Sequence, residues 1–529
     1  MISKWFKSYR YELLALAGVS LALGAGMSAW LGSGSFLVGW VGSSLLVLVC
    51  LWAMLAAWHL AGSGRGLAWM MAVAFVLRLG GGLLMTWQLP RLTDTDDTIY
   101  RAGFYFRDAY ARDREAWTVA QSGLFFSSSF KTDFMADQYG GMLVMSALVY
   151  RVLSPDAHRI YLILILTAAA GALGLPFFWS AVRRKWGSGV ALPAAWVLAV
   201  YPEGVLLGSS QMREPFVIAL SAVLFWGVVT WPQHKPYALA AFGAGLIGLF
   251  LLTPPAALAI TGIMLGWFFI QELGRRKGAT WPWWSWLVLA VGGVVMVGVM
   301  GEWLVTSSQW DISQTLAGSE RLQGLLARFP AVVKTLFVVV YGLTQPVLPA
   351  AAVVIVGTDT PMILKLANFF ASLGWYLLAP LLLYVVSAAW QVKDLVEKRA
   401  LAWLVGASYL WLLVASARAG GDQWDNPRYR AILLVIFALL AGVAWDWARV
   451  HRDAWLGRWL GVEGVFLFFF TGWYMKRYTP VGFKLPFWEM IGVIMAISVL
   501  ILGGGWALDR YAAHSHKTKP SLTQPPESL

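Results

Sequence analysis

Apolar stretches long enough to cross a lipid bilayer recur along almost the whole chain. A membrane-spanning helix needs about 20 mostly apolar residues, and about 14 stretches come near that length. They are residues 11–32, 36–61, 67–88, 159–182, 189–207, 215–231, 237–252, 255–272, 283–304, 366–390, 400–416, 430–447, 459–475 and 486–507. Only 13% of the residues are charged and 59% are hydrophobic, whereas about a quarter of a soluble chain is charged. We therefore expect an all-α polytopic membrane protein with about 14 transmembrane helices.

Clusters of basic residues predict which side of the membrane each loop faces. Residues 1–10 are basic, and Arg183-Arg184-Lys185 and Arg275-Arg276-Lys277 each follow an apolar stretch. Because Lys and Arg concentrate in short cytoplasmic loops, both termini are predicted to be cytoplasmic and the loop 89–158 extracytoplasmic. The same rule accounts for the net charge of +13 without a nucleic-acid partner. The expected location is a bacterial-type plasma (inner) membrane.

Two apolar stretches are predicted not to cross. Residues 139–153 are short for a span, so we expect a juxtamembrane helix on the external side. Residues 331–355 contain Gln345-Pro346 and Pro349. Proline interrupts a helix, so this stretch predicts a re-entrant segment that enters from outside and returns.

The external loop also predicts an amphipathic helix over residues 99–117. Its polar face would carry Arg101, Asp108, Arg112 and Glu115, and its apolar face Ile99, Phe106, Tyr110 and Trp117. Such a helix lies in the membrane interface.

Acidic and basic side chains gather in four segments on the predicted external side. These are residues 93–138, 209–215, 304–330 and 420–430. A carboxylate can accept a proton from a hydroxyl group, and a guanidinium can neutralise the charge that develops on a departing phosphate. The combination suits the transfer of a group from a phosphate to a hydroxyl.

Four motifs in these segments resemble those of the GT-C superfamily, the membrane glycosyltransferases that use polyprenyl-phosphate sugars. Asp96-Asp97-Thr98-Ile99-Tyr100 resembles the Asp-Glu-x-x-Tyr that opens the family's first external loop. Asp137-Gln138-Tyr139-Gly140-Gly141 and the stretch after it are similar to the family's juxtamembrane helix. Tyr201-Pro202 to Arg213-Glu214 is similar to its second acidic motif, and Asn426-Pro427-Arg428-Tyr429-Arg430 to its late basic segment. The likeness covers residues 90–450 and is greatest to the branch of protein O-mannosyltransferases and aminoarabinose transferases.

The resemblance implies a set of functional residues. The catalytic residues would be Asp96, as the base, with Asp97 and Glu214; substrate would be bound by Asp94, Tyr100, Asp137, Arg213, Arg428 and Arg430. The partners would be a polyprenyl-phosphate-linked sugar, membrane lipid, and a lipid, glycan or protein acceptor. The implied organisation is two extra transmembrane helices in 1–66, a catalytic membrane core in 67–450, further transmembrane helices in 451–510 and a disordered cytoplasmic tail in 511–529.

The same residues can also have purely structural roles. The aspartates near residue 96 can cap a helix, Glu214 can oppose a helix dipole, and Arg428 and Arg430 can anchor a span at the interface. We expect Arg78, inside a span, to be structural. The His residues show no zinc-ligand spacing, and Mg²⁺ or Mn²⁺ held by the aspartates with a substrate phosphate stays an option. Two other functions stay open: a flippase for a lipid-linked glycan, and an O-antigen-type polymerase or ligase.

Overall fold

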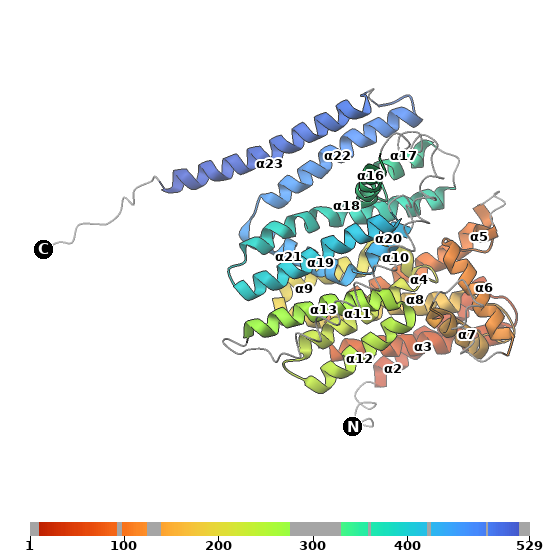
Figure 1. Cartoon of the computed structure of the whole chain (residues 1–529). Helices are drawn as coiled ribbons and strands as arrows, with labels where there is room; N and C mark the ends of the chain where they lie inside the picture. The colour runs from red at the N-terminus through yellow and green to blue at the C-terminus, as the bar shows by residue number, and fades with distance from the viewer. Residues whose placement is uncertain are drawn as a thin grey trace.

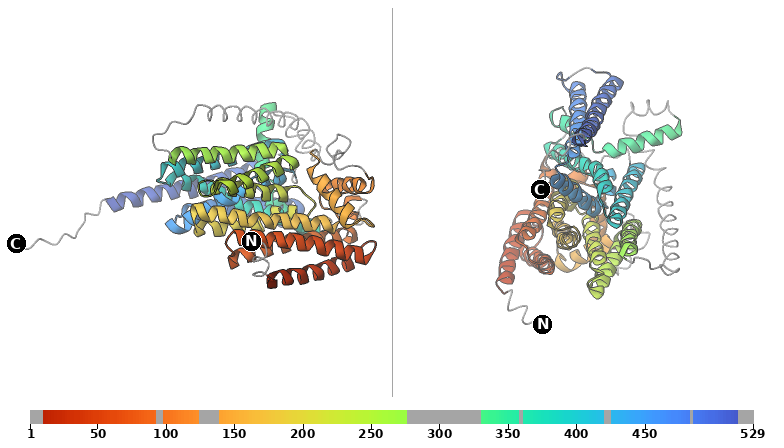
Figure 2. Two further views of the ribbon diagram at one scale, coloured as in Figure 1. Left: turned by 90° about the horizontal axis from the view of Figure 1, so that it is seen from below. Right: turned by 90° about the vertical axis from the view of Figure 1, so that its left-hand side faces the viewer.

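The computed structural model is helical throughout the residues that it describes. These are residues 10–92, 98–123, 139–275, 330–357, 361–419, 425–482 and 485–517, and no β-strand occurs in those ranges. Long helices run side by side along one direction and form a bundle (Figures 1 and 2). The all-α fold expected from the apolar stretches is confirmed.

Ten of the described helices are long and apolar enough to cross a membrane. They are α2 (Arg10–Leu31), α3 (Phe36–Leu60), α4 (Arg65–Leu92), α8 (Tyr161–Trp186), α12 (Lys235–Leu252), α13 (Pro254–Arg275), α18 (Met362–Gln391), α19 (Leu395–Ala419), α21 (Leu434–His451) and α23 (Phe487–Lys517). If the pair α9 (Ser188–Val200) and α10 (Pro202–Gly208), bent by 46°, is counted as one span, the number of candidate spans rises to eleven. The chain is therefore a multi-pass helical membrane protein by length and composition.

Three of the 14 predicted spans do not belong to this set. Helix α11 (Glu214–Thr230) has 17 residues, just below the length of a full span. Helix α22 (Trp455–Tyr478) carries Arg458, Glu463 and Lys476 among its apolar residues. The stretch 283–304 lies outside the described residues.

Three short helices gather at one end of the bundle, which we call the site end (Figure 1). They are α5 (Thr98–Arg101), α6 (Arg107–Gln121) and α7 (Gly141–Leu153). The short helix expected at 139–153 is α7. The prediction of a single amphipathic helix over 99–117 is wrong, because α5 ends at Arg101 and the chain turns at Gly103, where φ is +82°. That left-handed conformation favours glycine and interrupts the helix.

The stretch predicted to re-enter is two short helices, α16 (Ala331–Thr344) and α17 (Leu348–Gly357). The break between them leaves carbonyls at the end of α16 without helical partners. Two aromatic side chains of α18 supply donors: the indole nitrogen of Trp375 donates to the carbonyl of Leu343 at 2.8 Å, and the Tyr376 hydroxyl donates to that of Thr344 at 3.1 Å. The aromatic pair fastens the tip of this broken segment to α18.

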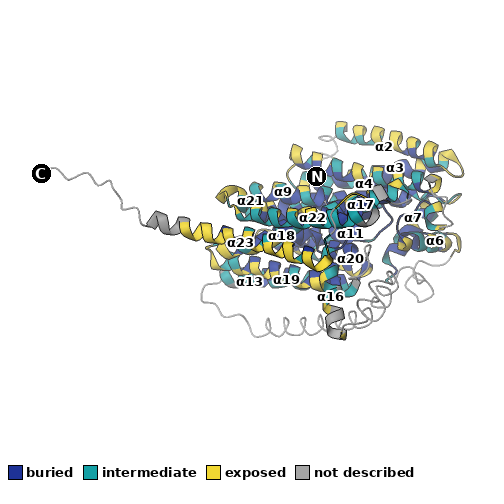
Figure 3. Cartoon of the chain, turned by 90° about the horizontal axis from the view of Figure 1, so that it is seen from above, coloured by how far each residue is buried: buried dark blue, intermediate teal, exposed yellow. Residues whose placement is uncertain are grey.

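Burial divides the bundle into a centre and a rim (Figure 3). Helix α8 is buried along most of its length, whereas α2 and α23 expose most of their apolar residues. Exposed apolar faces of this size suit contact with lipid. The polar residues described next lie between helices at the site end.

Candidate functional site

Arg428 lies between two carboxylates from distant parts of the chain. It belongs to α20 (Asp425–Ala431); its Nη1 is 2.9 Å from Oδ2 of Asp108 on α6, and its Nε is 3.3 Å from Oε1 of Glu214 on α11. Arg428 and Glu214 are buried, whereas half of the Asp108 side chain is exposed. A guanidinium offers separate N–H groups in one plane, so it can serve both carboxylates at once.

Several cations keep Asp108 ionised. Burial alone would raise the pKa of this carboxyl, but the charges of Arg428, Arg112 and Arg213 and the hydrogen bond from Arg428 outweigh it and hold the pKa below the ordinary value for aspartate. Asp108 is therefore an anion at neutral pH. Of the two carboxylates described here, Asp108 is the one that water can reach.

Arg430 forms a second pair deeper in the bundle. Its Nη2 is 3.0 Å from Oε1 of Glu203 on α10, and the Tyr201 hydroxyl donates to the other oxygen of Glu203 at 2.7 Å. The guanidinium lies over the ring of Trp375, 3.9 Å from its centre. Helical residues two apart point in nearly opposite directions. Arg428 therefore contacts α6 and α11, whereas Arg430 contacts α10 and α18.

The bend between α9 and α10 brings Glu203 to Arg430. Pro202 has no N–H, so it cannot bond the carbonyl of Leu198 as a helix would require. Arg78 of α4 does so instead: Nη2 donates to Leu198 at 3.3 Å and Nη1 to Ala199 at 2.7 Å. The expected structural role of Arg78 agrees with these bonds. Gly208 leaves room for it, because a Cβ there would lie 2.5 Å from the Arg78 side chain.

Some buried polar atoms of the two pairs have no hydrogen-bond partner within the described residues. They are Oε2 of Glu214 and Nε and Nη1 of Arg430. Buried polar groups are nearly always satisfied by protein, water or ligand. The small cavity lined by Glu203 and Arg428 has a volume of about 10 Å³, enough for about one water molecule.

The structure brings together part of the predicted site. Glu214 and Arg428 are in contact, and Arg213, at the start of α11, acts on Asp108 through its charge while its guanidinium lies 5.3 Å from the centre of the Tyr139 ring. Tyr100 packs beside the apolar cluster that includes Phe106. Arg430 does not join Arg428 but pairs with Glu203. The predicted residues Asp94, Asp96, Asp97 and Asp137 lie outside the described residues.

Asp108 was not among the predicted site residues. Its place on the polar face of a helix suggested contact with water. However, α6 turns part of that face toward the protein: Arg112 is buried and its Nη1 donates to the carbonyl of Gln211 at 3.1 Å. The signal that could have found Asp108 is the charge density of α6, since many charges on one short helix need partners. Glu203 was not among the predicted site residues either.

Trp117, on the predicted apolar face, is covered by the His158 ring, which stacks on it with ring centres 5.0 Å apart. Within the described ranges, no group of three His, Cys, Asp or Glu residues could hold a metal ion. The option of Mg²⁺ or Mn²⁺ concerned the aspartates near residue 96, which are not in those ranges.

Neither a protein-family model nor a curated protein matches the chain. The resemblance to GT-C glycosyltransferases therefore depends on the four motifs and their order.

Proposed function

We propose that this protein is an integral membrane glycosyltransferase that transfers a sugar from a polyprenyl-phosphate carrier to an acceptor hydroxyl on the extracytoplasmic face. One observation chiefly supports the proposal: α6, α11 and α20, which are remote in sequence, place Asp108, Glu214 and Arg428 in contact at one end of a membrane bundle. Such convergence of acid and guanidinium groups suits a reaction in which a phosphate departs.

The proposed reaction is a single displacement with inversion. The acceptor hydroxyl loses its proton to a carboxylate, its oxygen bonds to the anomeric carbon, and the bond from that carbon to the phosphate oxygen breaks with the electron pair leaving on phosphate. Asp96 is the proposed base and Asp97 a further proposed catalytic residue, and we propose that Asp94, Tyr100 and Asp137 bind substrate. Arg428 compensates the charge on the leaving phosphate.

Arg428 can receive the phosphate by exchanging partners. Its bond to buried Glu214 stays, because an unpaired buried carboxylate is costly. The bond to Asp108 is the one that yields, since half of the Asp108 side chain is already in water. Glu214 thereby keeps the guanidinium in place while one edge of it turns to the ligand.

The lipid tail of the carrier would lie near α16 and α17, which we propose form a re-entrant hairpin. Helix α16 exposes the apolar side chains of Leu336 and Val340. Trp375 connects the hairpin to Arg430. Its N–H donates a hydrogen bond to the end of α16, and the Arg430 guanidinium lies over its ring. An apolar surface next to a cationic site fits a long prenyl chain with a phosphate head.

The proposal is tested with the protein purified into lipid nanodiscs and supplied with polyprenyl-monophosphate sugars. Arg428→Gln and Glu214→Gln should each lower transfer about 100-fold, as removal of a charge-stabilising group does. Arg449→Gln is the matched control, since Arg449 also pairs with an aspartate but is 67% exposed at the opposite end of the bundle. Full transfer by Arg428→Gln, or transfer only from diphosphate carriers, would contradict the proposal.

A flippase for a lipid-linked glycan is the second candidate. Transporters often place charged residues beside broken helices within the bundle. The bent α9–α10 pair with Glu203 and Arg430 shows this arrangement. Movement of a lipid-linked sugar across liposomes without any covalent transfer would favour the flippase.

A further inference from the structure

Helix α6, which carries Asp108, also carries a fully buried carboxylate, that of Asp113, near its middle. Side chains from outside α6 contact this carboxylate and hold the helix in place. The Tyr150 hydroxyl of α7 donates to Oδ1 of Asp113, and Nε2 of His158 lies 2.8 Å from Oδ2. The His158 ring also stacks on Trp117, one helical turn after Asp113, at an interplanar angle of 23°. His158 therefore contacts two successive turns of α6.

A second fastening lies at the end of α6. Arg151 of α7 donates to the carbonyls of Val119 at 2.6 Å and Ala120 at 3.2 Å. A cation that bonds the last carbonyls also opposes the helix dipole there. The orientation of α6 is thus set by α7 and by the segment 154–160 that follows it.

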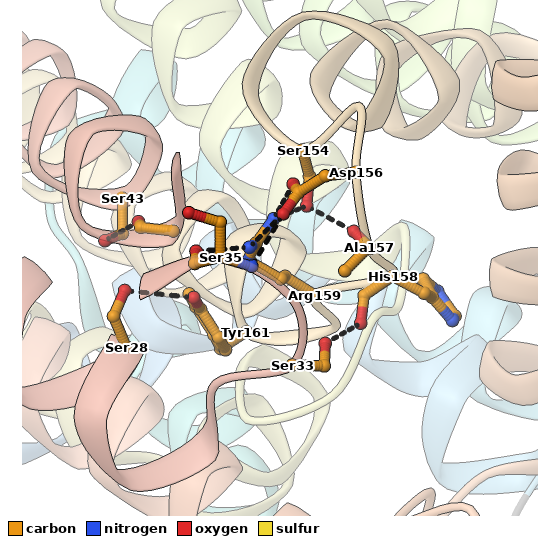
Figure 4. A network of polar contacts seen from close by, with 11 residues as sticks. Ser28, Ser33, Ser35, Ser43, Ser154, Asp156, Ala157, His158, Arg159 and Tyr161 are labelled. Carbon is orange, nitrogen blue, oxygen red and sulfur yellow. Dashed lines mark hydrogen bonds and ion pairs between the residues drawn. The ribbon is translucent and has the colours of Figure 1, made fainter. Parts of the chain in front are cut away.

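The loop between α2 and α3 forms hydrogen bonds with this segment (Figure 4). The Ser33 hydroxyl donates to the carbonyl of His158 at 3.0 Å, and the Ser35 N–H donates to Asp156 at 2.8 Å. Buried Arg159 donates to the carbonyl of Ser35 at 2.7 Å and forms a bidentate pair with Asp156, at 2.5 and 2.9 Å. The hydrogen bonds from Arg159 hold the pKa of Asp156 well below its usual range.

Glycines allow the close approach. Gly34 has φ +71°, and a Cβ there would lie 2.6 Å from that of Ala157. A Cβ on Gly39 would lie 2.8 Å from Nε of Arg159, and one on Gly42 2.3 Å from the carbonyl oxygen of Leu153. The α2–α3 hairpin is therefore shaped to hold residues 153–159, not only to cross the membrane.

We infer that the α2–α3 hairpin is a positioning element for the candidate site. It holds the segment 154–160, His158 of that segment holds α6 through Asp113 and Trp117, and α6 sets Asp108 against Arg428. His158 and Arg159 are the positioning residues. The catalytic meaning of the inference rests on the proposed function, but the placement of α6 can be measured without it.

The test is the distance between spin labels on α6 and on α18, measured by double electron–electron resonance in nanodiscs. Labels are placed at Arg114→Cys, which is exposed on α6, and at Leu366→Cys, which is 51% exposed on α18, in a Cys50→Ala background. The parent should give one narrow distance. Arg159→Gln and His158→Phe should each broaden and shift it, and should lower sugar transfer about 10-fold to 100-fold because a small misplacement of reacting groups is costly.

Arg458→Gln is the control, because Arg458 forms the same kind of bidentate pair with Asp509, between α22 and α23. It should leave the distance unchanged. An unchanged distance in folded Arg159→Gln and His158→Phe would overturn the inference, and Ser33→Ala tests the same grip if Arg159→Gln does not fold. If the parent transfers no sugar, the proposed function fails, while the distances still decide whether the hairpin positions α6.

Discussion

The two carboxylates that share Arg428 differ in how far they depend on it. Glu214 is buried, and Arg428 is the cation that pairs with it within the described part of the chain. Half of the Asp108 side chain is exposed, so water can replace the guanidinium. The contact of Arg428 with Glu214 is therefore costly to break, whereas its contact with Asp108 can be replaced by water.

Substitutions at this network should have unequal costs. Arg428→Leu should lower the free energy of unfolding by about 3–5 kcal/mol, because it leaves a buried charge unpaired. Asp108→Asn should cost about 1 kcal/mol or less, as for exposed ion pairs. Thermal unfolding in nanodiscs measures both, and equal losses would show that Glu214 does not depend on Arg428.

The pH dependence of stability should identify Asp108. Its folded-state pKa is lowered, so its contribution is present above the unfolded pKa of about 3.9 and is lost as pH falls through the folded value. The difference in melting temperature between the wild type and Asp108→Asn should be constant near neutral pH and shrink below about pH 4. A difference that grows on acidification would contradict the ionised state of Asp108.

At the scale of elements, the break between α9 and α10 is made by Pro202 and satisfied by Arg78. A proline alone would leave carbonyls unsatisfied in a medium without water. The guanidinium from α4 fills that need at Leu198 and Ala199, and so lets a span bend by 46° and carry Glu203 inward. Arg78, a charged residue within α4, therefore supplies hydrogen bonds that the backbone of the neighbouring bent span lacks.

Arg78→Met should therefore destabilise the fold by about 2–5 kcal/mol, since two buried carbonyls lose their donor. Arg78→Lys should cost less because an ammonium can still bond one of them. Arg449→Met, at an exposed position, should change the unfolding temperature little. Equal stability of Arg78→Met and wild type would show that the bend does not need this cap.

At the scale of the whole molecule, the charges at the two ends of the bundle predict its orientation. Helix α8 ends in Arg183, Arg184 and Lys185 at the end opposite α6. Clusters of this kind mark the cytoplasmic side. The site end should then face away from the cytoplasm.

Cysteine labelling on intact cells tests this orientation. In a Cys50→Ala background, Arg114→Cys on α6 should react with a membrane-impermeant maleimide. Lys235→Cys, which is exposed at the start of α12 near the opposite end, should react only after permeabilisation. The reverse pattern would place the candidate site in the cytoplasm and remove support for an extracytoplasmic transferase.

The sequence by itself determined where most helices lie. Hydrophobicity over about 20 residues is a local property that does not depend on neighbouring helices. Residues 36–61 were predicted and Phe36–Leu60 is the helix; 366–390 were predicted and Met362–Gln391 is the helix. The interruption at Gly103 was missed because one glycine in an amphipathic pattern leaves the pattern intact.

Only the tertiary structure decided which charges meet. Arg428 and Arg430 look alike in sequence, yet one joins Asp108 and Glu214 and the other joins Glu203. Likewise, periodicity showed that α6 has a polar face but not that Arg112 on it is buried. The physical reason is that an ion pair depends on which remote helices pack together, and helical periodicity describes one helix at a time.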